Sequence, residues 1–382
     1  MLSTICRVLF VTGEFPPRRG GISDHVVRLR AAFEAQGVQT DIATESVVAD
    51  DPEDGVYRTL VSPWGRQVLK VARLARQFRS DVVHIQYQAG AFASPLQPAM
   101  LPMALRLTGY SGLVAVTFHD LAEPYLFPRA GPLRRLAMDL LRGSADVCIY
   151  VDAYDRAKVD MRNPDEHQRS HVVPVGPTIE RPSSAGTRAG AREILGLPQN
   201  IFLIGFFGFR QVGKGLDSLA EAMRMPELAR SGTRLALIGA ATPDAGSRRA
   251  AAALSPETFA GLNVLDTGPL ESREVSTWLC ACDVAALPYD EGLSTRRGTF
   301  MVATAHGLPV VTTKPRRPDL LEIRDGEVAF IAAGDARALA LKLARVRNDS
   351  VYRAELESGA RAVAQRYSWR RIARRTLDAY SG

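Results

Sequence analysis

Three features that would identify whole classes of protein are missing from this 382-residue sequence. No apolar run reaches the roughly 20 residues that a membrane-spanning helix needs. The amino terminus enters an apolar segment at once, without the layout of a signal peptide. The cysteines have neither zinc-site spacing nor a second pair, and they are Cys6, Cys148, Cys280 and Cys282. We therefore predict a cytosolic protein with reduced cysteines and no metal site.

Signatures of several enzyme and binding classes are also missing. The sequence has no G-x-G-x-x-G loop for a nicotinamide-type dinucleotide and no G-x-S-x-G turn for a serine nucleophile. The arginines are spread along the chain, and no aromatic platform for stacked bases stands out, which argues against nucleic acid as a partner. The net charge of +7 is compatible with an anionic membrane surface or with phosphorylated ligands, and it selects neither.

Length and periodicity predict two α/β domains. A chain of 382 residues exceeds one ordinary domain. Near its start, an apolar strand at 7–12, a glycine-containing loop, a helix at 22–36 and a strand at 38–44 follow one another. This order is typical of a doubly wound parallel sheet. The pattern begins again with a strand at 201–207, after a linker at 177–190 that is rich in Pro, Ser and Gly.

Three further segments bear on partners. Residues 45–63 are acidic and are expected to be irregular, whereas residues 64–77 predict a basic amphipathic helix. Its basic side is more simply explained as the solvated face of a packed helix than as a membrane-surface patch. The tail at 368–380 predicts a second basic helix.

The segment from 284 to 313 predicts a strand, a polar loop, a helix that stops at Gly307, and another strand. In open α/β sheets ligands bind where such loops leave the carboxyl ends of the strands. Hydroxyls, guanidiniums and a glycine at a helix start suit a phosphate or diphosphate. The residues with these groups are Ser294, Thr295, Arg296, Arg297 and Gly298. A solvated loop with surface arginines is the alternative.

A second loop, G-F-R-Q-V-G-K-G at 208–215, nearly matches a phosphate-binding Walker A loop. Gly215 stands where the Mg²⁺-binding hydroxyl belongs, and no convincing acidic Walker B partner appears, so we do not expect an ATPase. What remains is a glycine-rich turn with Lys214 and Arg210 near a helix start, which suits a diphosphate. The alternative is a lysine in a surface turn.

Two candidate sites fall in the first half. Gly20 and Gly21 lie at a predicted helix start, which suggests close approach of the backbone to a ligand, although a flexible turn after two prolines is the alternative. His119 follows the predicted strand at 113–119 and would therefore face the ligand side of the sheet. A purely structural histidine remains the alternative there.

Together these segments resemble family 4 of the glycosyltransferases, retaining enzymes with the GT-B fold. The resemblance covers nearly the whole chain. It rests on G-E-F-P-P-R-R-G-G, V-V-H-I-Q-Y, T-F-H-D, F-F-G-F-R-Q-V-G-K-G-L-D-S-L, E-G-L-S-T-R-R-G-T-F-M-V-A-T-A-H-G-L-P-V-V-T-T and the closing S-W-R-R-I-A.

The resemblance implies an α/β protein of GT-B architecture, with two Rossmann-like doubly wound domains that face each other across a cleft. Residues 1–180 would form the acceptor domain, joined by the last helix at 367–382. Residues 181–366 would form the nucleotide-sugar donor domain.

The resemblance also implies roles for the candidate residues. Gly20 and Gly21 would approach the donor phosphates or the acceptor, and His119 would lie beside the transferred sugar. Lys214 would neutralise the leaving diphosphate. The helix opened by Ser294 to Thr299 would receive that diphosphate on its backbone N–H groups. Further residues assigned to this site are Gly208, Arg210 and Glu291. The nucleotide sugar is a co-substrate, and no cofactor or metal is required.

The sequence departs from the family pattern at two places. The family often has Arg after the glycine that matches Gly208, and here Phe209 stands there, with Arg210 one step on. It also often has two glutamates eight positions apart, at places that here hold Ser294 and Val302; Glu291 lies three residues too early. Our hypothesis is that Arg296 or Arg297 takes over the neutralisation of charge.

The predicted function is transfer of a sugar, with retention, from a nucleoside-diphosphate donor to a hydroxyl of a saccharide, lipid-linked or small-molecule acceptor. Such an enzyme would serve polysaccharide or glycoconjugate biosynthesis in the cytoplasm, and the basic helices fit peripheral contact with the inner membrane face. One alternative is a sugar-phosphate-processing relative, such as a phosphorylase or epimerase. The other is a non-catalytic or partner-dependent GT-B protein that binds sugars or nucleotides.

Overall fold

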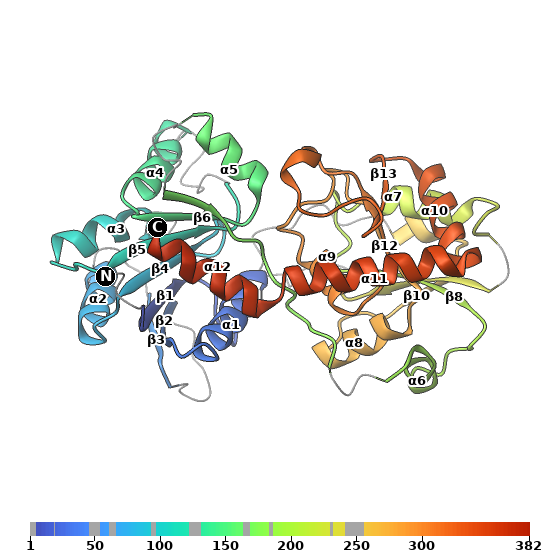
Figure 1. Cartoon of the computed structure of the whole chain (residues 1–382), viewed down its shortest axis with the longest axis horizontal. Coiled ribbons are helices and arrows are strands. Elements are labelled where there is room, and N and C mark those ends of the chain that lie inside the picture. Colours follow the sequence, from blue (N-terminus) through green and yellow to red (C-terminus); the bar gives the residue numbers. More distant parts are fainter. Residues whose placement is uncertain are drawn as a thin grey trace. The chain divides into compact units, whose positions relative to one another are not determined.

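The computed structural model describes residues 5–18, 20–45, 54–60, 66–92, 97–121, 131–162, 169–182, 186–229, 232–240 and 256–382. The chain divides into two compact units (Figure 1). Unit 1 consists of Met1–Gly176 and Trp369–Gly382, and unit 2 consists of Pro177–Ser368.

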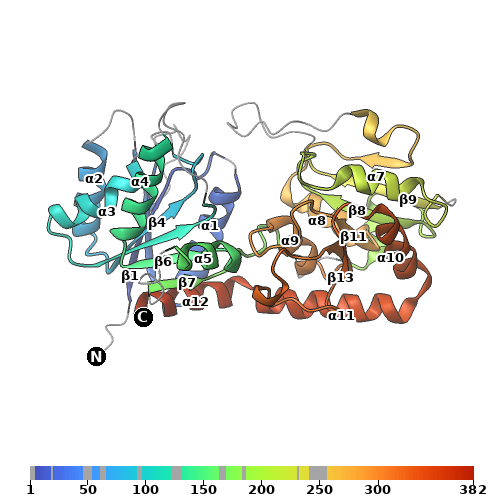
Figure 2. The same cartoon turned by 90° about the horizontal axis from the view of Figure 1, so that it is seen from above.

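Unit 1 is built on a seven-stranded parallel sheet with the strand order β3-β2-β1-β4-β5-β6-β7. The strands are β1 (Arg7–Thr12), β2 (Gln39–Glu45), β3 (Val56–Leu60), β4 (Val82–Tyr87), β5 (Leu113–Phe118), β6 (Val147–Tyr150) and β7 (Ser170–Val172). Its helices are α1 (Gly21–Glu34), α2 (Arg66–Gln77), α3 (Gln97–Leu107), α4 (Gly131–Gly143), α5 (Ala153–Asp160) and α12 (Trp369–Ser381). Helices α2, α3 and α4 cover one face of the sheet, and α1 packs beside α12 on the other (Figures 1 and 2). The central strands are buried on both faces, which explains their nearly continuous apolar sequences.

Unit 2 is built on a six-stranded parallel sheet with the order β10-β9-β8-β11-β12-β13. The strands are β8 (Phe202–Phe207), β9 (Thr233–Ile238), β10 (Val264–Asp266), β11 (Val284–Leu287), β12 (Val310–Thr313) and β13 (Ala329–Ile331). The helices are α6 (Arg188–Ile194), α7 (Leu216–Arg224), α8 (Ser272–Ala281), α9 (Gly298–Ala305), α10 (Ala336–Asn348) and α11 (Ser350–Arg366), with 3₁₀ turns at Pro256–Phe259 and Pro318–Leu320.

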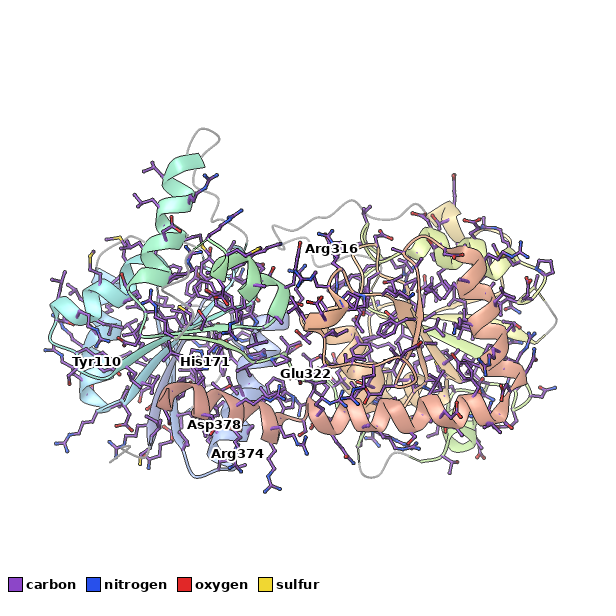
Figure 3. The ribbon with its side chains drawn as sticks, turned by 45° about the horizontal axis from the view of Figure 1, so that its top comes forward. Tyr110, His171, Arg316, Glu322, Arg374 and Asp378 are labelled. Carbon is purple, nitrogen blue, oxygen red and sulfur yellow. The ribbon has the colours of Figure 1, made fainter. Side chains whose placement is uncertain are left out.

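The last helix, α12, completes the core of unit 1. Trp369 and Tyr380 are buried, and the Tyr380 hydroxyl lies 2.7 Å from Nδ1 of His84 on β4. The chain leaves unit 1 at Gly176, where a Cβ atom would come within 2.6 Å of the Trp369 ring. Arg374 and Asp378, labelled in Figure 3, lie on the exposed face of this helix. The predicted basic tail helix is therefore an amphipathic helix that packs on the first sheet.

The structure confirms the α/β prediction and corrects several details. The segment expected to be irregular contains β3, whose half-buried residues give no clear strand pattern; residues 46–53 lie outside the described residues. The expected linker contains the start of α6. The sequence also did not predict α3, α4 and α5.

The described part of the chain contains no helix with the length and apolar character needed to cross a bilayer. The four cysteines are free, and the described residues contain no cluster of three or more side chains suited to a metal ion.

A buried ion pair ties the start of unit 2 to its sheet. Asp283, directly before β11, accepts hydrogen bonds from Arg192 of α6 at 2.6 Å and from the Leu203 N–H of β8 at 2.8 Å. Arg188 of α6 adds a contact at 3.4 Å. Removing one partner from such a pair leaves the other charge buried and uncompensated.

Asp283→Ala is therefore expected to lower the free energy of unfolding by roughly 3–5 kcal/mol, because Arg192 loses its counter-ion while it stays buried. Urea unfolding followed by circular dichroism measures this change. Asp319→Ala is the matched control, since Asp319 pairs with Arg317 at an exposed site. Equal effects of the two substitutions would contradict the structural role of Asp283.

Candidate active site

The predicted site residues fall into two groups, one in each unit. Gly208, Lys214, Glu291 and the segment 294–299 belong to unit 2, whereas Gly20, Gly21 and His119 belong to unit 1. In unit 2 the strand order reverses between β8 and β11, so the loops that follow these neighbouring strands leave the same edge of the sheet. Such a switch point is where open α/β sheets bind ligands.

Glycine allows the two loops at this switch point to touch. Gly215 has φ +67°, and a Cβ atom on it would lie 1.7 Å from the Pro288 carbonyl oxygen. The Gly213 carbonyl accepts a hydrogen bond from the Asp290 N–H at 3.3 Å. No other residue type fits at Gly215, so the backbone contact fixes the place of Lys214 between these two glycines.

Two cations lie over the ring of Tyr289 in this loop pair. The Lys214 Nζ atom is 5.7 Å from the ring centroid, and the Arg297 Cζ atom is 4.8 Å from it. The ring is fully buried, and its hydroxyl is 2.7 Å from Oγ1 of Thr299 on α9. Burial raises the pKa of Tyr289 to about 12, so the phenol stays neutral at physiological pH. The face of the aromatic ring therefore attracts both cations and stabilises their positive charges.

Lys214 has no carboxylate partner among the described residues. Burial, and next the charge of Arg297, lowers the pKa of Lys214 to about 8. At pH 7 most of these side chains are still protonated. A half-buried ammonium without a counter-ion is costly to the free protein, and an anionic ligand would remove that cost.

Glu291 is shared by three guanidinium groups. Its Oε2 atom lies 3.4 Å from Nη2 of Arg296 and 3.3 Å from Nη2 of Arg297, and its Oε1 atom lies 3.7 Å from Nη2 of Arg316. Arg316 comes from the segment after β12 (Figure 3). One carboxylate faces three positive charges, so with Lys214 the loop pair keeps a surplus of positive charge.

The amino end of α9 adds partial positive charge. Its N-cap residue, Arg297, makes no capping hydrogen bond with its side chain, and a Cβ atom at Gly298 would meet open space. The Ser294 Oγ atom is buried and has no hydrogen-bond partner among the described residues. Val302 is fully buried within α9. The helix start, an unpaired hydroxyl and nearby guanidiniums form a site suited to an anion.

Gly208 and Arg210 hold the loop in place. Gly208 has φ +126°, and a Cβ atom there would lie 2.9 Å from Cγ2 of Thr299. Arg210 binds both carboxylate oxygens of Asp266, one of them at 2.7 Å. Burial disfavours the charged carboxylate, yet the bonds from Arg210 and from the Gly268 N–H outweigh it and keep the pKa of Asp266 below its usual value. The charge of Arg210 is thus already balanced, unlike that of Lys214.

In unit 1, His119 directly follows β5, at the carboxyl end of the strand. Its Nε2 atom lies 2.8 Å from Oε1 of Gln86, so in this arrangement Nε2 carries the proton. Burial, and next the nearby His84, lowers the pKa of His119 to about 3. His119 is therefore a neutral imidazole across the physiological range, fixed in one tautomer by Gln86.

A chain of polar side chains links His119 to α12. The Gln86 Nε2 atom lies 3.2 Å from Nε2 of His84, which in turn contacts Tyr380. The His25 ring of α1 packs edge-on against the His119 ring, with 4.7 Å between the ring centroids. The Nδ1 atom of His25 is buried and has no hydrogen-bond partner among the described residues. Sequence reasoning missed Gln86 and His25. The only signal was the polar end of V-V-H-I-Q.

The two predicted glycines of unit 1 lie at the start of α1. The Gly20 carbonyl accepts the first helical hydrogen bond, from the Asp24 N–H at 3.0 Å, and a Cβ atom on Gly20 would lie 2.4 Å from Oε2 of Glu14. A Cβ atom on Gly21 would meet nothing within 4 Å. The backbone at Gly21 is thus open on its side-chain face.

Two family models match the chain. The model described as Glycosyltransferase Family 4 matches residues 19–181, and the model described as Glycosyl transferases group 1 matches residues 199–349.

Two curated relatives match almost end to end. D-inositol 3-phosphate glycosyltransferase of Xylanimonas cellulosilytica is 26% identical over 95% of this chain and 91% of its own length. The GDP-mannose-dependent monoacylated alpha-(1-6)-phosphatidylinositol monomannoside mannosyltransferase of Corynebacterium glutamicum is 23% identical over 96% of each chain.

Solved structures confirm the predicted GT-B fold. Sucrose-phosphate synthase from Thermosynechococcus elongatus superposes with a TM-score of 0.73 at 18% identity over 98% of both chains. WaaG, a glycosyltransferase of lipopolysaccharide biosynthesis, superposes with a TM-score of 0.67 at 18% identity over 98% of this chain and 100% of its own.

Lys214→Met is expected to raise the midpoint of thermal unfolding at pH 7, because it removes an uncompensated charge from a half-buried position. The gain should shrink as the pH rises through about 8, where the wild-type lysine loses its proton in the folded state. Differential scanning calorimetry from pH 6 to about 9 measures the unfolding midpoints of the two proteins and their difference. Lys314→Met, at an exposed position of the same unit, is the control and should show no such trend. A Lys214→Met protein that is less stable at every pH would contradict this description.

Gln86→Glu is expected to raise the pKa of His119 by about 1–3 units, because a carboxylate would then face its Nε2–H. Histidine ring chemical shifts measured by NMR against pH report this change, with the resonance assigned from His119→Asn. Gln88→Glu places the same charge two residues on and serves as the control. A His119 resonance that titrates equally in both variants would rule out a specific role for Gln86.

Proposed function

The chain belongs to glycosyltransferase family 4, whose members are retaining enzymes that use nucleotide sugars, and on that premise we propose that unit 2 binds the donor diphosphate beside Lys214. The observation that carries this proposal is the half-buried Lys214 ammonium, which lies with Arg297 over Tyr289 and has no carboxylate partner among the described residues. The diphosphate would supply the missing negative charge. The backbone N–H groups at the start of α9 would bind its oxygens.

The proposed chemistry follows from this charge. The bond between the anomeric carbon and the diphosphate oxygen breaks, and positive charge builds on the sugar ring while negative charge builds on the leaving diphosphate. Fixed cations and helix N–H groups stabilise that negative charge without reorganising. The acceptor hydroxyl then forms the new bond on the same face of the sugar, and the leaving phosphate takes its proton.

The two places where the family often has glutamates hold Ser294 and Val302 here. We propose that one of the arginines that follow Ser294, Arg296 or Arg297, takes over the neutralisation of charge. We assign diphosphate contact to Arg297, because it shares the Tyr289 platform with Lys214. Glu291 keeps both guanidiniums oriented toward the loop. Ser294 offers its unpaired hydroxyl to the donor. Arg210 contributes less charge, because Asp266 already balances it.

Unit 1 would supply the acceptor side. We assign His119 to hydrogen bonding with the transferred sugar as a neutral imidazole, and Gly20 and Gly21 to close backbone contact with the ligand. The Corynebacterium glutamicum relative is named for a phosphatidylinositol monomannoside, and the relative from Xylanimonas cellulosilytica is named for an inositol phosphate. Both names support an acceptor hydroxyl on an anionic, lipid-linked or inositol-phosphate-like molecule. Peripheral contact with the cytoplasmic membrane face follows for a lipid-linked acceptor.

One nucleoside diphosphate is expected to stabilise the protein without metal. UDP, GDP and ADP are each added with EDTA at increasing concentration, and thermal unfolding is followed. At about 100 times its dissociation constant the correct nucleotide adds about 2.7 kcal/mol of stability. Lys214→Ala should abolish this shift and lower transfer from the matching nucleotide sugar at least about ten-fold. Arg337→Ala, at an exposed position of α10, should leave both unchanged.

Other outcomes select the alternatives. Stabilisation by a diphosphate without turnover across donors and acceptors would favour a binding protein. Nucleotide release that does not depend on an acceptor hydroxyl would favour a related sugar-phosphate enzyme. Stabilisation by ATP–Mg²⁺ alone would overturn the proposed donor site.

A further inference from the structure

Three neighbouring helices of unit 1 present an unusual outer surface. Helices α2, α3 and α4 pack side by side over one face of the sheet (Figures 1 and 2). They carry six of the thirteen large apolar side chains that are exposed in the described residues. These six are Leu69, Met100, Met103, Leu107, Leu133 and Leu136. We call these six side chains, together with the exposed cations Lys70, Arg73 and Arg76 of α2, the α2–α4 surface.

The spacing of these side chains along α3 shows that they form an outer apolar face of their own, separate from the buried core. Met100, Met103 and Leu107 recur three and four residues apart, which places them in one stripe along α3. Leu101 and Leu105 of the same helix are buried, so α3 has an inner and an outer apolar face. An exposed apolar stripe of this kind is typical of a surface that contacts a partner outside its own unit.

The same helices are rich in basic residues. Together they contain eight arginines or lysines and one aspartate, a net charge of +7, which equals the net charge of the whole chain. The rest of the chain is therefore neutral overall. Two of these arginines are ion-paired, Arg142 with Asp139 of α4 at 2.5 Å and Arg106 with Asp146, which lies between α4 and β6. Lys70 and Arg73, both exposed on α2, have no ion-pair partner among the described residues.

We propose that the α2–α4 surface docks the enzyme on an anionic lipid bilayer, an inference that rests on the proposed lipid-linked acceptor. A bilayer matches both halves of the pattern, because its phosphate groups attract Lys and Arg while leucine and methionine enter the acyl boundary. A nucleic acid would leave the apolar stripe uncovered. A second copy of this chain would bring two surfaces of the same charge together.

Vesicle sedimentation of the full chain tests this docking. Vesicles of phosphatidylcholine mixed with phosphatidylglycerol are expected to bind the protein, and those of phosphatidylcholine alone to bind it far more weakly. Lys70→Gln with Arg73→Gln should weaken binding about 25-fold, since each cation near an anionic surface contributes about five-fold. Met103→Ser with Leu107→Ser should weaken it at least about ten-fold.

Matched controls come from exposed helix positions of unit 2. Arg337→Gln with Arg361→Gln removes two exposed cations from α10 and α11, and Leu341→Ser with Val351→Ser removes two exposed apolar side chains. Neither pair should change vesicle binding. All variants replace exposed side chains, and circular dichroism verifies that each one is folded.

Several results would overturn the docking surface. They are absent binding to anionic vesicles, equal binding to neutral vesicles, and equal losses in the control pairs. Self-association of the wild type that the Met103→Ser with Leu107→Ser pair abolishes would assign the surface to a second copy instead. The diphosphate thermal shift, measured on the same variants, separates the two proposals. A retained shift without vesicle binding defeats only the docking, and vesicle binding without a shift defeats only the donor site.

Discussion

Contact between two backbone segments sets the electrostatics of unit 2. Gly215 lies so close to the Pro288 carbonyl that no side chain fits between them, and this contact fixes Lys214 over the ring of Tyr289. Arg297 lies over the same ring from the start of α9. The lysine is therefore partly dehydrated beside another cation, and folding of the sheet provides the free energy that this arrangement costs. An anion that bound beside Lys214 would find these positive charges already in place.

Local patterns predicted the frame of this site but not its contacts. The strand, glycine loop and helix at 202–216 and the unit from 284 to 313 each lie within about 30 residues, so periodicity and glycine placement reveal them. The approach of Gly215 to Pro288, and the sharing of Glu291 by three arginines, depend on how the strands order in space, which no local pattern encodes. In unit 1, the histidine after β5 was predictable from its place at a strand end. Its neutral state was not predictable, because it depends on burial and on Gln86 and His84, which lie on the neighbouring strand β4.

Three of the four missed elements, all except α5, have a shared physical cause. β3 is a half-buried edge strand, and α3 and α4 are apolar on their outer as well as inner faces, so neither gives a clean alternation of apolar and polar residues. Because α3 and α4 carry apolar residues on their outer faces, their sequences lack a clear helical period. The same outer apolar residues suggest a second apolar partner for these helices. The departures from family 4 fall in both loops of the switch point, at Phe209 and in the segment that contains Ser294 and Val302. Val302 packs in the core of α9, and the arginines before it form ion pairs at the loop.

Both ends of the described chain contribute to one unit. Trp369 and Tyr380 of α12 are buried in unit 1, where Tyr380 meets His84 of β4. On the ribosome, residues 177–368 are all synthesised before α12, so unit 2 has every strand and helix it needs while unit 1 still lacks a helix that covers its sheet. Unit 1, whose synthesis begins first, is therefore the last unit to be completed. The series of hydrogen bonds from Tyr380 to His119 forms only after the final residues of α12 have been synthesised.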